Sequence, residues 1–190
     1  MLEDSFIKEI EHAPCMNGCV EALGHHAYKI DGGDGLSENI GFNNGTLSNV
    51  DYFCKRDNDI QLIELSDLIN SINECNVNMR SMLIDQQKKK GKKLSSTEEK
   101  KIRKKAWFPI TSEFSKKWSG SIAVIERLYR KNKVLSDDPN YHMLIICKNN
   151  TDIIMLDSLK TQLIGMIRSL RICTTENASE NLLAIIKPKN

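Results

Sequence analysis

The sequence lacks any long hydrophobic run. Its two longest uninterrupted apolar stretches, 143–147 and 182–186, have five residues each, whereas a membrane-spanning helix needs about 20. The N-terminal residues 1–6 contain two acids and no basic residue, so they do not have the basic and then apolar order of a secretory signal. We therefore expect a cytoplasmic protein that does not enter a membrane.

The chain also has little net charge. Its 27 basic residues exceed its 25 acidic residues by only two, so the overall charge indicates no particular partner. Locally, however, ten basic residues and only two glutamates fall within 88–105. Such a cluster can contact the phosphates of a nucleic acid, which is the partner we expect, although a solvated linker and helix face would have the same composition. The cluster consists of Lys88, Lys89, Lys90, Lys92, Lys93, Lys100, Lys101, Arg103, Lys104 and Lys105.

Length and composition are those of an ordinary globular domain. With 190 residues, of which 40% are hydrophobic and 27% charged, the chain can bury one proper core. We therefore expect residues 1–190 to fold as a single domain. A homodimer or a protein partner is compatible with this size.

The six cysteines are expected to be free thiols. Cys54 and Cys147 fall in expected strands and Cys75 in an expected helix, where they act as small apolar residues of a reducing compartment. Cys15 and Cys19 could instead contribute to a zinc site. Their spacing is not that of the usual Cys-x2-Cys pair, and no second pair follows.

The pattern of apolar residues predicts an α/β fold with a mixed sheet (α+β). Residues 50–55 and 60–65 are rich in strand formers and flank a turn sequence, which predicts a β-hairpin. A strand, a helix and a further strand near the C-terminus imply a parallel pair of strands. The full expected order is helices over 3–12 and 16–25, a glycine-rich loop over 31–49, the hairpin, a helical insertion over 68–135, a strand over 141–148, a helix over 153–170 and a strand over 181–187.

Two local signals subdivide the helical insertion. The lysine-rich segment 88–93 breaks the helical periodicity and is expected to be a mobile, basic connection. Residues 95–99 contain two overlapping capping-box registers, so a new helix is expected to begin there. Pro109 is expected to end that helix, because proline cannot continue a helix interior.

Two acids occupy facing positions of the expected hairpin. A two-residue turn at 57–58 places Asp51 directly opposite Glu64, with Cβ atoms about 4.5–5.5 Å apart. A turn at 58–59 would instead place Asp51 opposite Ser66, with Glu64 as its diagonal neighbour on the same face. A change of one residue in the loop length would send the two acids to opposite faces. In the facing register the acids share their side of the sheet with Phe53 and Leu62, and two like charges on an apolar surface need a proton or a cation.

A divalent ion would satisfy this pair. Mg²⁺, or Mn²⁺ in its place, prefers carboxylate oxygens supplemented by water and phosphate. An ion held by Asp51 and Glu64 could support hydrolysis of a phosphodiester bond, since a metal polarises the phosphate and lowers the pKa of an attacking water. Solvated acids on an edge hairpin, or salt bridges to nearby lysines and arginines, are the alternatives.

These residues resemble the motif of the PD-(D/E)XK nuclease superfamily. Asp51, twelve intervening residues and Glu64-Leu65-Ser66 match an acid on one strand followed by acid-x-lysine on the next. The resemblance implies a restriction-endonuclease-like core, made of the hairpin and the strand–helix–strand unit, and a metal-dependent nuclease acting on DNA or RNA. It also implies an association with defence against phage or mobile elements.

The sequence departs from that motif at two positions. Val50 stands where the family often has proline, and Ser66 stands where it has the lysine. Some members supply this lysine from a nearby helix, so the resemblance makes Lys116 or Lys117 the candidates here. It also makes Glu21 a candidate for an upstream acid on the metal, for which an ordinary surface glutamate is the alternative. The alternative is a catalytically inactive relative that binds nucleic acid or a partner protein, which the serine at position 66 favours.

Overall fold

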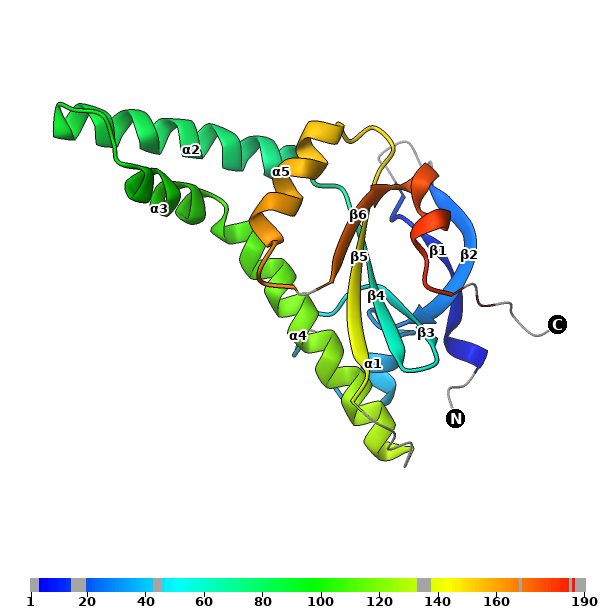
Figure 1. Ribbon diagram of the computed structural model, residues 1–190. Coiled ribbons are helices and arrows are strands. Elements are labelled where there is room, and N and C mark those ends of the chain that lie inside the picture. Colours follow the sequence, from blue (N-terminus) through cyan, green and yellow to red (C-terminus); the bar gives the residue numbers. More distant parts are fainter. Residues whose placement is uncertain are drawn as a thin grey trace.

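A six-stranded mixed sheet forms the centre of the molecule (Figure 1). The computed structural model describes residues 4–14, 20–42, 46–132, 138–167, 169–184 and 186. In sheet order the strands are β1 Ile7–Glu11, β2 Ala22–Lys29, β3 Tyr52–Arg56, β4 Asp59–Ser66, β5 Asn140–Cys147 and β6 Leu170–Thr174. Strands β1 to β4 pair antiparallel, whereas β4, β5 and β6 pair parallel. The expected mixed α/β fold is confirmed.

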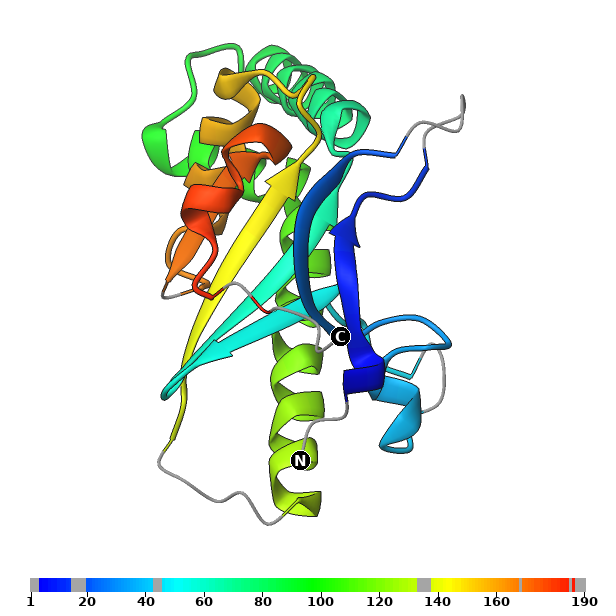
Figure 2. The ribbon, with the colours of Figure 1, turned by 90° about the vertical axis from the view of Figure 1, so that its right-hand side faces the viewer.

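The long α-helices cover one face of this sheet, and the short 3-10 helices near the C-terminus cover the other (Figure 2). The helical elements are η1 Asp4–Phe6, α1 Leu36–Asn39, α2 Ile69–Lys90, α3 Ser96–Ala106, α4 Phe108–Lys131, α5 Ile153–Leu163, η2 Thr175–Asn177 and η3 Ser179–Asn181. Helix α4 runs along the sheet, while α2 and α3 project from it as an arm (Figure 1). Within the described ranges, no helix combines the length and apolarity needed to cross a bilayer.

The hairpin forms in the register that the sequence predicts. Arg56 pairs with Asp59 and Phe53 pairs with Leu62, so the turn consists of residues 57 and 58. Asp57 has a φ of 53°, a left-handed conformation that aspartate tolerates better than most residues. Because strand residues alternate between faces, this register decides which side chains meet α4.

The N-terminal prediction is wrong. Residues 4–11 form η1 and β1, and the described part of 16–25 leads into β2, with which β1 pairs antiparallel. The apolar residues 6, 7 and 10 fit a helical spacing, but Ile10 is instead buried against Ala27 in the core on the far side of the sheet. Tertiary pairing has therefore overridden a short helical pattern. Cys15 and Cys19, the suggested zinc ligands, lie outside the described residues.

The C-terminal prediction is right about the parallel unit and wrong about its last strand. Helix α5 ends at Leu163, and Gly165 follows with a φ of 90°, a conformation that interrupts a helix and suits glycine. The strand that pairs parallel with β5 is β6, not the segment 181–187. Of that segment, residues 181–183 are bound to the sheet by a side chain, Gln61, which accepts from Leu183 N and donates to the Asn181 carbonyl, both at 2.8 Å.

Helices α2, α3 and α4 occupy the position of the expected insertion. Ser95 and Glu98 form the capping box at the start of α3, as the sequence predicts. Helix α2 continues through Lys90 to Gly91, so half of the expected basic connection is helical. Pro109 lies in the first turn of α4, where its missing N–H costs no hydrogen bond, and it therefore begins a helix close to the point where α3 ends.

Helix α4 packs closely against the segment that leads to Asp51. Gly120 faces the Ser48 carbonyl oxygen, which would lie 2.1 Å from a Cβ added there. Next to it, Ser121 Oγ accepts a hydrogen bond from Val50 N at 2.8 Å. These two small residues let the helix backbone approach the chain directly before Asp51, which places the helix face near the acids.

Replacing Gly120 by alanine should test this approach. The added methyl group meets backbone rather than a movable side chain, so we expect the free energy of unfolding in urea to fall by about 2 kcal/mol or more. Ser119→Ala, one residue earlier on the exposed side of α4, is the control and should change stability by less than about 0.5 kcal/mol. Equal effects of the two substitutions would contradict the close approach.

Candidate functional site

Two carboxylates from adjacent strands lie on the face of the sheet that α4 covers. One further step of the hairpin register places Asp51, directly before β3, opposite Glu64 on β4. The backbone N–H of Leu65 donates to Asp51 Oδ2 at 2.8 Å, which holds the Asp51 side chain beside β4. Phe53 and Leu62, on the same face, are fully buried, so the two acids adjoin an apolar surface.

A lysine from α4 contacts the buried Glu64. Lys117 Nζ donates to Glu64 Oε1, and the same oxygen accepts a hydrogen bond from Ser66 Oγ at 3.2 Å. Lys117 Nζ also lies 3.7 Å from Glu113, one helical turn earlier. Only 3% of the Glu64 side chain and 21% of the Lys117 side chain are exposed. Ser66 and the ammonium group of Lys117, which the helical insertion supplies, therefore both donate to the same oxygen of Glu64.

Burial and like charge act on both carboxylates. Desolvation, and then the charge of Asp51, raise the pKa of Glu64 to about 8, and Lys117 only partly offsets them. Desolvation also raises the pKa of Asp51, against the lowering effects of the Leu65 N–H and of Lys117. Desolvation lowers the pKa of Lys117, but the surrounding carboxylates outweigh it and raise the value overall. The site thus favours uptake of a proton or a cation.

Each carboxylate keeps an oxygen for a further partner. Glu64 Oε2 is buried and has no hydrogen-bond partner within the described residues, which is a costly state for a polar atom. The hydrogen bond that Asp51 makes to the described chain uses Oδ2, and this leaves Oδ1. The described residues contain no convergence of three His, Cys, Asp or Glu side chains, so an ion held here would take further ligands from water or substrate, as Mg²⁺ commonly does.

The two candidate lysines differ in their surroundings. Lys117 contacts Glu64, whereas its neighbour Lys116 is exposed and lines a surface cavity with Ser115 and Ser119. Successive residues of a helix point about 100° apart, so only one of the pair can face the sheet. The sequence could not distinguish between them without the crossing angle of α4.

Glu21 is not brought to the pair. It directly precedes β2 instead of lying on a helix, and its Oε2 accepts from Asn149 N at 3.1 Å and from Thr175 Oγ1 at 2.9 Å. It therefore links the ends of β5 and β6. The acid whose charge raises the Asp51 pKa is Asp31. Asp31 could not be recognised from the sequence as a neighbour of the site, because its position follows from the pairing of β2 with β3.

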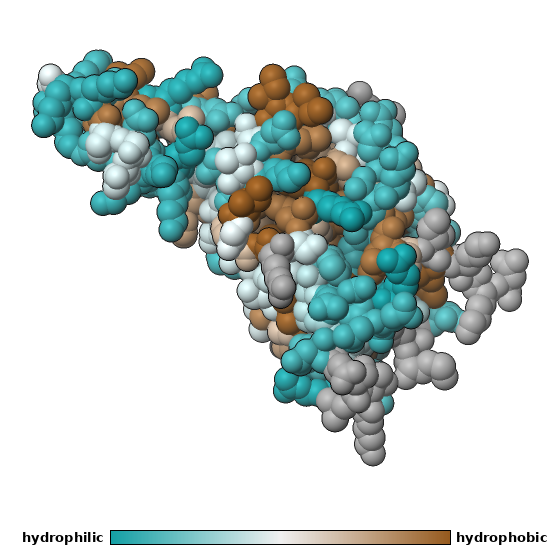
Figure 3. All heavy atoms as spheres, in the orientation of Figure 1, coloured by the Kyte–Doolittle hydropathy of each residue, from teal (hydrophilic) through white to brown (hydrophobic). Residues whose placement is uncertain are grey.

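The basic cluster lies on the arm formed by α2 and α3. All ten of its side chains are exposed, and in Figure 3 the outer end of the arm is mainly hydrophilic. Within the described residues, one of the ten is ion-paired, Lys90 with Glu98. The arm begins at Ile69, only a few residues after Glu64, so it is joined to the acids through the end of β4.

A comparison of the chain with known protein families, curated proteins and solved structures finds no match. The site is therefore interpreted from its own geometry. That geometry combines two carboxylates, one ammonium group and one hydroxyl group in a poorly solvated position. Such a set can hold a cation or exchange a proton.

Stability without metal should depend on pH through Glu64. Unfolded, this carboxyl ionises near its ordinary pKa of 4.5, whereas in the folded chain its pKa is about 8. Between these values the folded state binds a proton that the unfolded state does not, so the free energy of unfolding should fall as pH rises, by on the order of a few kcal/mol in total. Asp51 acts in the same direction.

The measurement is urea unfolding at pH 5, 6, 7 and 8 with a chelator present. Glu64→Gln should remove most of the decline, because the amide does not ionise. If the wild type and this variant show the same pH dependence, Glu64 is already ionised at neutral pH and the interpretation of its burial is wrong.

Proposed function

We propose that this protein is a metal-dependent nuclease that hydrolyses phosphodiester bonds in DNA or RNA, with its active site at Asp51, Glu64 and Lys117. The observation that carries the proposal is the contact of Lys117 with Glu64. A lysine beside the acid of β4 is what the PD-(D/E)XK motif requires and what position 66 lacks. The α4 lysine fills that role from a different part of the chain.

The residues present fit a divalent ion. Asp51 and Glu64 would hold it, since the buried Glu64 Oε2 has no partner among the described residues and Asp51 uses only one oxygen for Leu65. When bound, Mg²⁺ or Mn²⁺ would polarise the phosphate and make a bound water more acidic. Cation binding competes with the proton on Glu64, so affinity should rise with pH.

The side chains of the protein would perform the remaining tasks. Lys117 is held at Glu64 and beside Glu113, and its charge also acts on Asp51. An ammonium group in this position can stabilise the negative charge that develops on the phosphate. Ser66 orients Glu64 through its hydrogen bond to Oε1. The Leu65 N–H keeps the Asp51 carboxylate turned toward β4.

The arm would contact the nucleic acid at a distance from the acids. Helix α2 has 22 residues, which corresponds to a length of about 33 Å. This is close to one turn of a DNA duplex, about 34 Å. Lysines at the outer end of the arm are therefore suited to binding phosphates roughly one duplex turn from the scissile bond, without taking part in its cleavage.

The central prediction concerns cleavage. With Mg²⁺ or Mn²⁺, the protein should cut plasmid or single-stranded substrates, and Asp51→Asn, Glu64→Gln and Lys117→Met should each lower the rate by roughly 100-fold or more. Lys116→Met, the matched control on the next residue of α4, should stay within about twofold of the wild type. Gel analysis of the products over time gives the rates.

The result also separates this proposal from an inactive, binding-only relative. The observation favouring that alternative is again the Lys117–Glu64 contact, because an ammonium group can serve simply to neutralise a buried carboxylate. Absence of cleavage with every metal and substrate, together with retained binding of nucleic acid, would support the alternative. A wild-type rate that none of the three substitutions changes would reject the site itself.

A second prediction concerns the arm. Lys92→Gln combined with Lys93→Gln should weaken binding of a short duplex at low salt and reduce the slope of log K against log salt concentration by about two, since each phosphate contact contributes about 0.9. Arg130→Gln combined with Lys131→Gln, at the other end of the insertion, is the control of equal charge change. Fluorescence anisotropy across a salt series makes the measurement, and equal slopes for both double variants would exclude the arm as a contact.

A further inference from the structure

A pocket separate from the carboxylate pair lies on the face of the sheet opposite α4. It has a volume of about 420 Å³, within the range of small-molecule sites, roughly 300–1,000 Å³. Its floor includes Gln61, a neighbour of Ile63 on the face that packs away from the helices. The pocket is therefore separated from Asp51 and Glu64 by the sheet itself.

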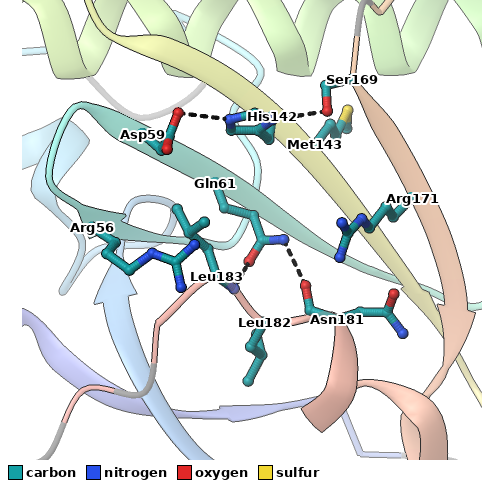
Figure 4. Close-up of a pocket in the computed structure, with 10 residues that line it drawn as sticks. All are labelled: Arg56, Asp59, Gln61, His142, Met143, Ser169, Arg171, Asn181, Leu182 and Leu183. Atoms are coloured by element: carbon teal, nitrogen blue, oxygen red, sulfur yellow. Dashed lines mark hydrogen bonds and ion pairs between the residues drawn. The ribbon is translucent and has the colours of Figure 1, made fainter.

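The walls of this pocket come from four separate parts of the chain. They are the turn end of the β3–β4 hairpin, the N-terminal half of β5, the start of β6 with the residue before it, and the segment 181–183. The last wall is tied to the floor, because the buried Gln61 amide binds the backbone of Asn181 and of Leu183 (Figure 4). This side chain helps to hold the wall, together with the antiparallel bridge between Ile186 and His26.

The carboxylate that lines the pocket, Asp59, forms a hydrogen bond with a histidine. Asp59 Oδ1 lies 3.1 Å from His142 Nε2, and His142 Nδ1 lies 2.8 Å from Ser169 Oγ. The hydrogen bond from His142 lowers the pKa of Asp59, so Asp59 is an ionised partner of the imidazole. Arg56 is the direct cross-strand neighbour of Asp59, yet the carboxylate turns to His142 instead.

Two guanidinium groups at the pocket are not ion-paired among the described residues, although the charge of Arg56 helps to lower the Asp59 pKa. In the described part of the chain, neither Arg56 nor Arg171 takes part in any of the ion pairs. Figure 4 shows both side chains reaching toward the middle of the pocket from opposite sides. Two arginines against one engaged carboxylate give the pocket an excess of positive charge, and the guanidinium fork matches the oxygens of a phosphate group.

We infer that this pocket binds the phosphate group of a small phosphorylated ligand, with Arg56 and Arg171 as the phosphate-binding residues and Ser169 as a further hydrogen-bonding group. The wall formed by 181–183 and the limited volume favour a ligand the size of a mononucleotide over a polymer. The site is distinct from the carboxylate pair and does not depend on the proposed nuclease activity.

Calorimetric titration of the full chain tests this inference. The probes are inorganic phosphate, adenosine 5′-monophosphate and a short single-stranded oligonucleotide without terminal phosphates. Saturable binding of phosphate or of the monophosphate is expected, and Arg56→Met and Arg171→Met should each weaken it by roughly tenfold or more. A preference for the monophosphate over inorganic phosphate would identify a nucleotide-like ligand, and equal affinities would identify the phosphate group alone as the recognised element.

Two controls make the outcome decisive. Arg80→Met removes an exposed arginine of α2 and should leave binding unchanged. Glu64→Gln should lower the cleavage rate, if the nuclease proposal holds, without affecting phosphate binding. The inference is overturned if neither small probe binds at millimolar concentration, if only the oligonucleotide binds, or if the two pocket variants bind as well as Arg80→Met. All three arginines are exposed, so the variants should fold, and their circular dichroism spectra verify this.

Discussion

The burial of Glu64 is the constraint on which the candidate site depends. A carboxylate on a central strand, under a helix and nearly without solvent, is unfavourable unless something compensates its charge. Lys117 does so in part from α4, and the close approach of that helix rests on Gly120 and Ser121. The stability of the core and the chemistry of the site are therefore linked through one contact between sheet and helix.

The same contact places an amine beside Glu64 although the strand position two residues later holds Ser66. In the resembled motif, acid and lysine lie two residues apart on one strand and thus point to the same face. Here Ser66 has that strand position and hydrogen-bonds to Glu64, while the ammonium group comes from across the layer boundary. A helix that packs on the sheet can thus place a long side chain over a strand carboxylate without a lysine on the strand itself.

The sequence predicted those features of the fold and the site that depend on residues close together in the chain, and not those that depend on contacts between distant segments. The hairpin and its register were predictable because the turn at 57–58 and the alternation of apolar residues are local, and they brought Asp51 and Glu64 to one face. The capping box at Ser95 is equally local. The strand β1 was mistaken for a helix because its pairing with β2 is not visible in a short apolar pattern, and Glu21 was misplaced with it. The choice of Lys117 over Lys116 required the packing of α4.

The joint between the arm and the core carries a mechanical consequence. Helix α3 ends at Ala106 and α4 begins at Phe108, with the buried Trp107 as the single residue between them. Because one buried residue joins the two helices, the orientation of the arm relative to α4 is set at Trp107. Since α4 also carries Lys117, the helix that contacts Glu64 is connected through this residue to the arm that carries the basic cluster.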